Sequence, residues 1–151
     1  FNSRPHISVE TDYTEGLNRS KEFLAGAELF MKRKQFAIAT FMIHQSIEQS
    51  LRTFIRIGLC YSINTHNINK LIRYAIWVDH RLPAIVLRKT NEQKRLYSLL
   101  QQSYIESRYT RNFSIHERDV ATLIVKATEI QDLLVKSGME IIQATISSVT
   151  V

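Results

Sequence analysis

The segment YIESRYTRNFSIHERDV, Tyr104–Val120, carries residue types and a spacing that suit the cleavage of a phosphodiester. A metal-independent ribonuclease needs a group that moves protons at the ribose 2′-hydroxyl and the leaving oxygen, and a cation that stabilises the charged transition state. An imidazole such as that of His116 can act as acid or base, and the guanidinium of Arg111 can clamp a phosphate through two hydrogen bonds. We therefore name Arg111 and His116 as candidate catalytic residues. The alternative is a hinge between two helices, with His116 as a helix-capping residue.

Arg108 and Tyr109 stand just before this pair. Together with Arg111 they are candidate ligand-binding residues that shape or charge a cleft for a nucleotide or RNA phosphate. The chain has 20 basic and 14 acidic residues, a net charge of +6 and a pI near 9.6. This excess is compatible with a nucleic acid, a nucleotide phosphate or an acidic partner, although basic domains that bind none of these are common.

His44 and Glu48 lie one helical turn apart on an otherwise apolar helix face, and His66 stands just before a predicted helix. Polar groups at such buried positions must be satisfied by neighbouring side chains or by a loop backbone. We predict that His44, Glu48 and His66 are structural polar residues, and that His66 pins its loop to the helix by hydrogen bonding. The alternative is that they support a functional site from behind.

The common cofactor and metal motifs are absent from the sequence. The four glycines, at positions 16, 26, 58 and 138, do not form a glycine-rich phosphate loop. There is no His-Glu-x-x-His motif, and the single Cys60 allows neither a disulfide nor a cysteine-based metal site. We therefore expect no metal and no cofactor, and we expect Cys60 to be a buried, unreactive thiol.

Length and composition indicate one all-α domain. A chain of 151 residues suits a single core, and 44% hydrophobic residues with only 4 Gly and 2 Pro leave few of the turn residues that an all-β chain needs. No run approaches the roughly 18 apolar residues that span a membrane, and the N-terminus lacks a signal-peptide pattern. We expect a cytoplasmic protein without membrane contact.

Hydrophobic periodicity predicts an up-and-down bundle of four main helices plus one or two short helices, with antiparallel neighbours. Residues 1–13 are predicted to be an extended lead-in or linker, and residues 14–138 the helical bundle. The C-terminal tail, residues 139–151, is either a further helix or a strand. The expected helices cover residues 14–34, 35–59, 67–78, 92–107 and, from Ser114 or His116, the segment up to residue 138.

Polar residues, Pro and Gly mark the expected helix ends. Thr65 or Asn67 can cap the helix that begins near residue 67, and Thr90 or Asn91 can cap the next main helix. Pro83 is expected to interrupt the segment between them, which then forms a short turn or helix. Gly138 is expected to stop the last helix.

Three motifs resemble those of the HEPN domain, a helical module that often accompanies nucleotidyltransferases. They lie in FLAGAELFMKRKQFAIATFMIHQSIEQSLRTFI, in NTHNINKLI and in LYSLLQQSYIESRYTRNFSI. The matching residues are a His-Gln-x-x-Glu with its following Leu (His44, Gln45, Glu48, Leu51), a Thr-His-x-Ile (Thr65, His66, Ile68) and an Arg-Tyr pair (Arg108, Tyr109). In this order the resemblance covers about Leu24 to Val135, which is most of the chain.

The resemblance implies a bundle of four or five helices, like that of nucleotidyltransferase substrate-binding subunits. It also implies a frequent symmetric dimer in which the loops between the fourth and fifth helices face a shared cleft. Ribonuclease members carry an Arg followed four to six residues later by a His, a spacing that Arg111 and His116 fit. In the branch that this chain resembles most, the Arg-Tyr pair is the regular feature, and a helix-capping residue occupies the position of His116.

Two functions of different classes follow. The favoured one is a non-catalytic binding and dimerisation module, the C-terminal part or the partner of a nucleotidyltransferase, with a basic cleft for a nucleotide or RNA phosphate. The alternative is a toxin-like endoribonuclease, of the toxin–antitoxin kind, that uses Arg111 and His116 across a dimer. The start at Phe1 favours the first. A homodimer is expected because the last helix and the tail carry surplus apolar residues: Ile141, Ile142, Ile146 and Val149.

Overall fold

The computed structural model describes residues 6–109 and 114–149, and the side chains of residues 8–105 and 114–148. All regular secondary structure within these ranges is helical, so the prediction of an all-α fold is confirmed. The described helices are α1 (His6–Lys32), α2 (Phe36–Leu59), α3 (Ile68–Ala75), α4 (Leu82–Ile85), α5 (Asn91–Tyr109) and α6 (Glu117–Val149).

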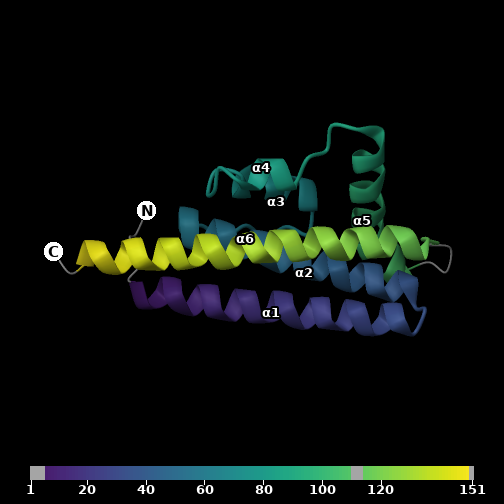
Figure 1. Cartoon of the computed structure of the whole chain (residues 1–151), viewed down its shortest axis with the longest axis horizontal. Helices are drawn as coiled ribbons and strands as arrows, with labels where there is room; N and C mark the ends of the chain where they lie inside the picture. Colours follow the sequence, from purple (N-terminus) through teal and green to yellow (C-terminus); the bar gives the residue numbers. More distant parts are fainter. Residues whose placement is uncertain (1–5, 110–113, 150–151) are drawn as a thin grey trace.

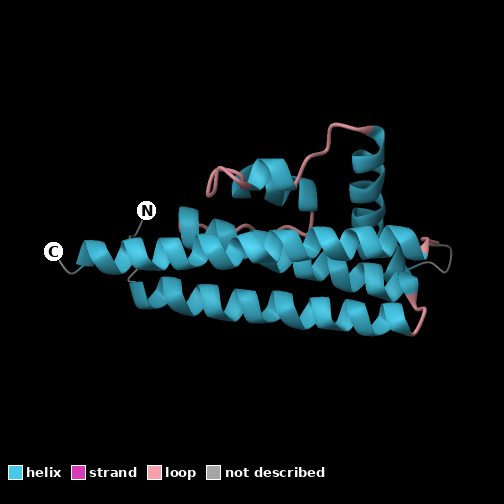
Figure 2. Ribbon diagram, in the orientation of Figure 1, coloured by secondary structure: helices cyan, strands magenta, loops and turns pink. Residues whose placement is uncertain are grey.

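The long helices α1, α2 and α6 lie side by side and form the frame of the molecule (Figure 1). The shorter helices α3, α4 and α5 stand on one side of this frame, joined by loops (Figure 2). α2 is the central helix, because it contacts α1, α3, α5 and α6. Apolar or small residues occupy most of its circumference, and Ile43, Ile47, Leu51 and Phe54 are all 0% exposed.

Buried serines tie the frame together. Ser20 on α1 donates through Oγ to the carbonyl oxygen of Ser46 at 3.0 Å, and Ser46 Oγ donates to the carbonyl oxygen of Ser20 at 2.9 Å. Ser50 Oγ lies 2.7 Å from Ser20 Oγ, which also accepts from Gln131 Nε2 of α6 at 3.0 Å. Small side chains let α1 approach α2 closely, and the mutual hydrogen bonds satisfy polar groups that water does not reach.

α1 begins at His6, so the predicted extended lead-in is wrong for residues 6–13. Val9 is 5% exposed, and the hydroxyl of Tyr13 donates to the carbonyl oxygen of Val135 at 3.4 Å. Val9 and Tyr13 are four positions apart and therefore share one face of α1. Burial of this face of α1 inside the frame stabilises the helix by more than the weak helix propensity of residues 6–13 costs.

α6 runs through Gly138 as far as Val149. The predicted stop at Gly138 is therefore wrong, and the described part of the tail, residues 139–149, is helix rather than strand. The ring of Tyr13 occupies the space that a Cβ at position 138 would fill. This glycine serves the contact between α1 and α6, and that contact offsets the cost of about 1 kcal/mol that a glycine brings to a helix interior.

Two of the predicted caps are present. Asn67 Oδ1 accepts from the backbone N–H of Lys70 at 3.0 Å. Thr90 Oγ1 accepts from the backbone N–H of Gln93 at 3.1 Å, while Gln93 Oε1 accepts from that of Thr90 at 3.1 Å, which is a capping box. At the C-terminus of α2 the structure differs from the sequence-based expectation. Cys60 is not buried as expected but is the exposed C-terminal cap of this helix, with a φ of 54°.

We expect Gly138→Ala to destabilise the protein, because the new methyl group would collide with the Tyr13 ring. Overpacking of this kind costs about 1–3 kcal/mol. Gly26→Ala is the matched control, since its added Cβ would meet Met42 at ordinary distances of 3.6 and 3.8 Å. Urea unfolding of both variants measures the difference, and equal free energies of unfolding for the two would contradict the packing role of Gly138.

Candidate functional site

The buried carboxylate of Glu48, on α2, lies at the centre of a cluster of polar side chains. Glu48 is 2% exposed, and its Oε1 accepts a hydrogen bond from His66 Nδ1 at 2.8 Å. Because a carboxylate oxygen only accepts, the bond places a proton on Nδ1 of His66. Arg52, one turn further along α2, holds its Nε 3.7 Å from Glu48 Oε2. The carboxylate thus has the positive charge and the hydrogen bond that its burial requires.

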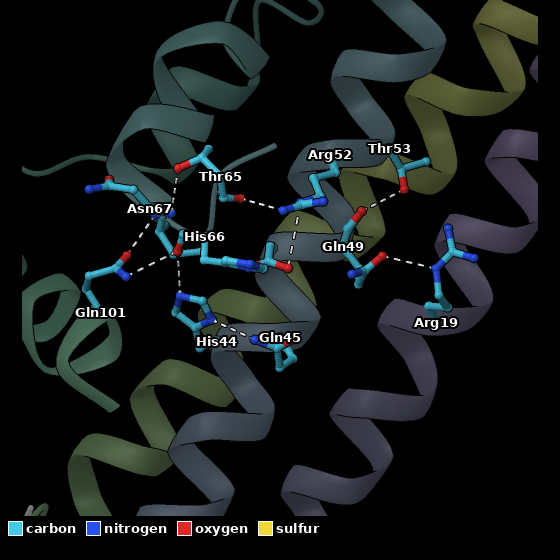
Figure 3. Close-up of polar contacts among 12 residues, drawn as sticks. Arg19, His44, Gln45, Gln49, Arg52, Thr53, Thr65, His66, Asn67 and Gln101 are labelled. Atoms are coloured by element: carbon cyan, nitrogen blue, oxygen red, sulfur yellow. Dashed lines mark hydrogen bonds and ion pairs between the residues drawn. The ribbon is translucent and has the colours of Figure 1, made fainter. Parts of the chain in front are cut away.

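Side chains of α2 also hold the backbone of the loop between α2 and α3, as Figure 3 shows. Arg52 Nη2 donates to the carbonyl oxygen of Thr65 at 2.6 Å, and His44 Nε2 donates to that of His66 at 3.0 Å. Gln45 Nε2 lies 3.2 Å from His44 Nδ1, which is left as the acceptor. The hydrogen bonds that we predicted between His66 and this helix are present.

Burial sets the charge of His44, whose side chain is 0% exposed. Desolvation lowers the pKa of His44 to about 4, and its hydrogen bond to the carbonyl oxygen of His66 opposes only part of that shift. The ring is therefore neutral at physiological pH. A neutral, enclosed imidazole with both nitrogens hydrogen-bonded suits a structural role.

α5 closes the cluster from the other side. Gln101 Nε2 donates to the carbonyl oxygen of His66 at 3.1 Å, and its Oε1 accepts from the backbone N–H of Ile68 at 2.8 Å. The ring of Tyr104 stacks on those of His44 and His66, with centroids 4.9 and 4.7 Å apart and an interplanar angle of 22° in both cases. α2, the loop after it and α5 are thus joined by one hydrogen-bonded and stacked network.

The residues predicted to bind a ligand lie around the connection between α5 and α6. Arg108 and Tyr109 occupy the last turn of α5, one turn beyond Tyr104 and its stacked histidines. Arg111, the predicted phosphate clamp, lies outside the described residues. The cluster around Glu48 therefore anchors the helix that leads into this connection.

His116 stands immediately before α6 with an exposed side chain. Its carbonyl oxygen accepts from the backbone N–H groups of Asp119 at 3.0 Å and Val120 at 3.1 Å, which is the N-cap position. Asp119 accepts two hydrogen bonds from Arg95 of α5, at 2.8 and 3.1 Å, and this contact lowers the pKa of Asp119. The paired Asp119 and Arg95 hold the start of α6 against α5.

A second group of basic residues lies at the same end of the frame. The turn between α1 and α2 is found there, at the same end as the start of α6 (Figure 1). Lys32 at this turn and Glu117 of α6 line one open cavity of about 400 Å³. We refer to the exposed basic residues here as the basic end: Lys32, Arg33, Lys34, His116 and Arg118.

Among the described residues, no three His, Cys, Asp or Glu side chains lie close enough together to hold a metal ion. No helix in the same ranges is both long and apolar enough to cross a membrane. A comparison with curated proteins found no match. A comparison with protein families matched the HEPN domain over residues 13–138. The chain belongs to the HEPN family.

Two of the sequence motifs that suggested the resemblance meet in the cluster around Glu48. His44 and Glu48 of the first motif contact His66 of the second directly. Sequence reasoning missed Gln101, although it makes two hydrogen bonds to the loop that carries His66. Its only signal is its position three residues before Tyr104, which places both side chains on one face of α5.

We expect His44→Gln to reduce the loss of stability at mildly acidic pH. Because the pKa of His44 drops from 6.5 to about 4 on folding, the unfolded chain binds more protons between those values, and stability falls as the pH falls through this window. The wild type therefore loses about 3 kcal/mol of folding free energy through this window, at about 1.4 kcal/mol per pKa unit. Gln keeps an N–H donor but does not titrate.

Urea unfolding of the wild type and of His44→Gln, at about pH 7.5 and about pH 4.5, measures this difference. His80→Gln is the control, because His80 is an exposed histidine outside the cluster. An equal loss of stability on acidification in the wild type and His44→Gln would show that His44 is not the group responsible.

Proposed function

We propose that this HEPN domain is a non-catalytic binding and dimerisation module, the C-terminal part or the partner of a nucleotidyltransferase. Its ligand is a nucleotide or RNA phosphate, bound by the basic end together with Arg108, Tyr109 and Arg111. The observation that carries the proposal is that the basic turn between α1 and α2 lies at the same end of the frame as the start of α6, where His116 and Arg118 lie (Figure 1).

The charges at this end support an anionic ligand. All five residues of the basic end are exposed. They outnumber Glu28 and Glu117, the two carboxylates that line the adjoining cavity and oppose an anion. Asp119 adds little negative charge, because Arg95 pairs with it at 2.8 Å. The start of α6 contributes backbone N–H groups and the positive end of the helix dipole. A phosphate is therefore attracted by several cations and by a helix N-terminus together.

Exposed apolar residues on α6 support the dimer. Val125, Met139 and Ile146 are 57%, 62% and 37% exposed. Their positions differ by multiples of seven, which places them on one stripe of the helix. Ile141 and Ile142, which we named from the sequence, are half-buried against the core instead. A second copy of the chain would cover the Val125, Met139 and Ile146 stripe.

The alternative is a metal-independent, toxin-like endoribonuclease in which Arg111 and His116 act across a dimer. The exposure of the His116 side chain favours it, because a general acid or base must reach its substrate. The N-cap position gives His116 a structural reason to stand where it does, so we prefer the binding module.

We expect Arg33→Ala/Arg111→Ala to weaken binding of a fluorescently labelled single-stranded RNA, measured by anisotropy at low salt. Loss of two phosphate contacts reduces the slope of log affinity against log salt by about 1.4, because each contact to a single strand contributes about 0.7. The control is Lys21→Ala/Lys136→Ala, which removes the same charge from exposed positions inside α1 and α6. Equal affinity of the two double variants, or no binding by the wild type, contradicts the proposed site.

The same RNA, separated on a denaturing gel after incubation, distinguishes the two functions. The binding module leaves the RNA intact. Cleavage that the wild type performs and that both Arg111→Ala and His116→Ala abolish would replace the binding module by the ribonuclease.

We expect light scattering to give twice the chain mass of 17.6 kDa for the wild type and the monomer mass for Met139→Lys. A lysine in the stripe on α6 places a charge in an apolar interface, which opposes association. Trp77→Lys is the matched control, because Trp77 is 79% exposed but lies outside the stripe. A monomeric wild type, or a dimer that Met139→Lys leaves intact, contradicts this interface.

A further inference from the structure

An open groove lies between α3, α4 and α5 and has a volume of about 790 Å³. Sites that hold one small organic ligand have volumes of about 300–1,000 Å³. Apolar, amide and basic side chains line the groove, and no Asp or Glu is among them. The groove shares no residue with the basic end.

The groove has an apolar part and a basic part. Its exposed apolar surface comes from Ile76 just after α3, from Leu87 after α4 and from Ile105 of α5, and Leu87 and Ile105 are 39% and 54% exposed. The basic part consists of side chains from the next loop and the start of α5: Arg88, Lys89 and Lys94. Lys89 and Lys94 are exposed, and Arg88 reaches across the groove to donate to Asn69 Oδ1 at 2.7 Å. The groove therefore joins an apolar surface to a localised positive charge.

Tyr97 of α5 lines the groove and is 5% exposed. Its hydroxyl oxygen is buried and has no hydrogen-bond partner among the described residues. Burial raises the pKa of Tyr97 to about 12, so the hydroxyl is a neutral donor at physiological pH. A buried hydroxyl without a partner costs folding free energy, and because solvent does not reach it, Tyr97 belongs to the wall of the groove rather than to its exposed surface.

Hydrogen bonds hold the walls of the groove in place without a ligand. Lys126 of α6 donates through Nζ to the carbonyl oxygen of Ile85, which fixes α4. Gln101, which lines the groove, holds the start of α3 through the backbone N–H of Ile68 at 2.8 Å. A preformed site of this kind loses little conformational freedom when a ligand binds.

We propose that this groove binds a small organic anion that joins an apolar body to a carboxylate, phosphate or sulfonate group. The body lies on Ile76, Leu87 and Ile105, and the acidic group faces Lys89 and Lys94. Charge complementarity selects an anion, and the volume suits a single small molecule. The site is independent of the phosphate-binding function proposed above, because the two share no residue.

The probe 8-anilinonaphthalene-1-sulfonate, an aromatic body with one sulfonate, tests the site by fluorescence titration of the full chain. We expect Lys89→Ala/Lys94→Ala to weaken binding by roughly tenfold, as expected for loss of charge-assisted contacts. Lys21→Ala/Lys136→Ala, which removes equal charge from elsewhere, should leave the affinity unchanged. N-phenyl-1-naphthylamine, which lacks the sulfonate, should bind at least about tenfold more weakly than the anionic probe.

Tyr97→Phe separates a binding role of the hydroxyl from a structural one. Removal of a buried, unpartnered hydroxyl should raise the thermal midpoint and leave the affinity for the anionic probe unchanged, because solvent does not reach this hydroxyl. A native near-ultraviolet circular dichroism spectrum, which requires fixed packing of the aromatic side chains, excludes binding of the probe to partly folded protein. Equal affinity of Lys89→Ala/Lys94→Ala and the wild type, or equal binding of the two probes, would overturn the proposal.

Discussion

The burial of one carboxylate, that of Glu48 in the central helix, is the constraint on which the arrangement of the shorter helices depends. A carboxylate at 2% exposure is costly unless charge and hydrogen bonds compensate it. His66 at 2.8 Å and Arg52 at 3.7 Å provide that compensation. Because His66 belongs to the loop after α2, satisfying Glu48 also determines where the loop runs and where α3 begins.

The position of this loop in turn positions α5. Gln101 of α5 makes two hydrogen bonds to the backbone of residues 66 and 68, and Tyr104 of α5 stacks on His44 and His66. α5 then holds the start of α6 through the paired Arg95 and Asp119. The frame of α1, α2 and α6 is held differently, by apolar contacts and the buried serines around Ser20. A connection that joins two such anchored helices is where binding residues concentrate in many proteins.

The two proposed ligand sites use different physical chemistry. At the basic end the attraction comes from exposed charges and a helix N-terminus, so it weakens as salt screens it. In the groove an apolar surface acts together with the positive charge of Lys89 and Lys94, so part of the attraction does not depend on salt. Gln101 lines the groove and also contacts His66, so the groove borders the cluster around Glu48.

The sequence by itself determined the helical fold, the caps at Asn67 and Thr90 and the family motifs, because periodicity, capping and motif spacing are local properties. Only the tertiary structure decided that α6 continues through Gly138, since the reason is the ring of Tyr13 on a distant helix. Only the tertiary structure likewise shows the two hydrogen bonds of Gln101 to the loop after α2 and the burial of the Tyr97 hydroxyl. Such contacts join residues far apart in the chain, and no local pattern specifies them.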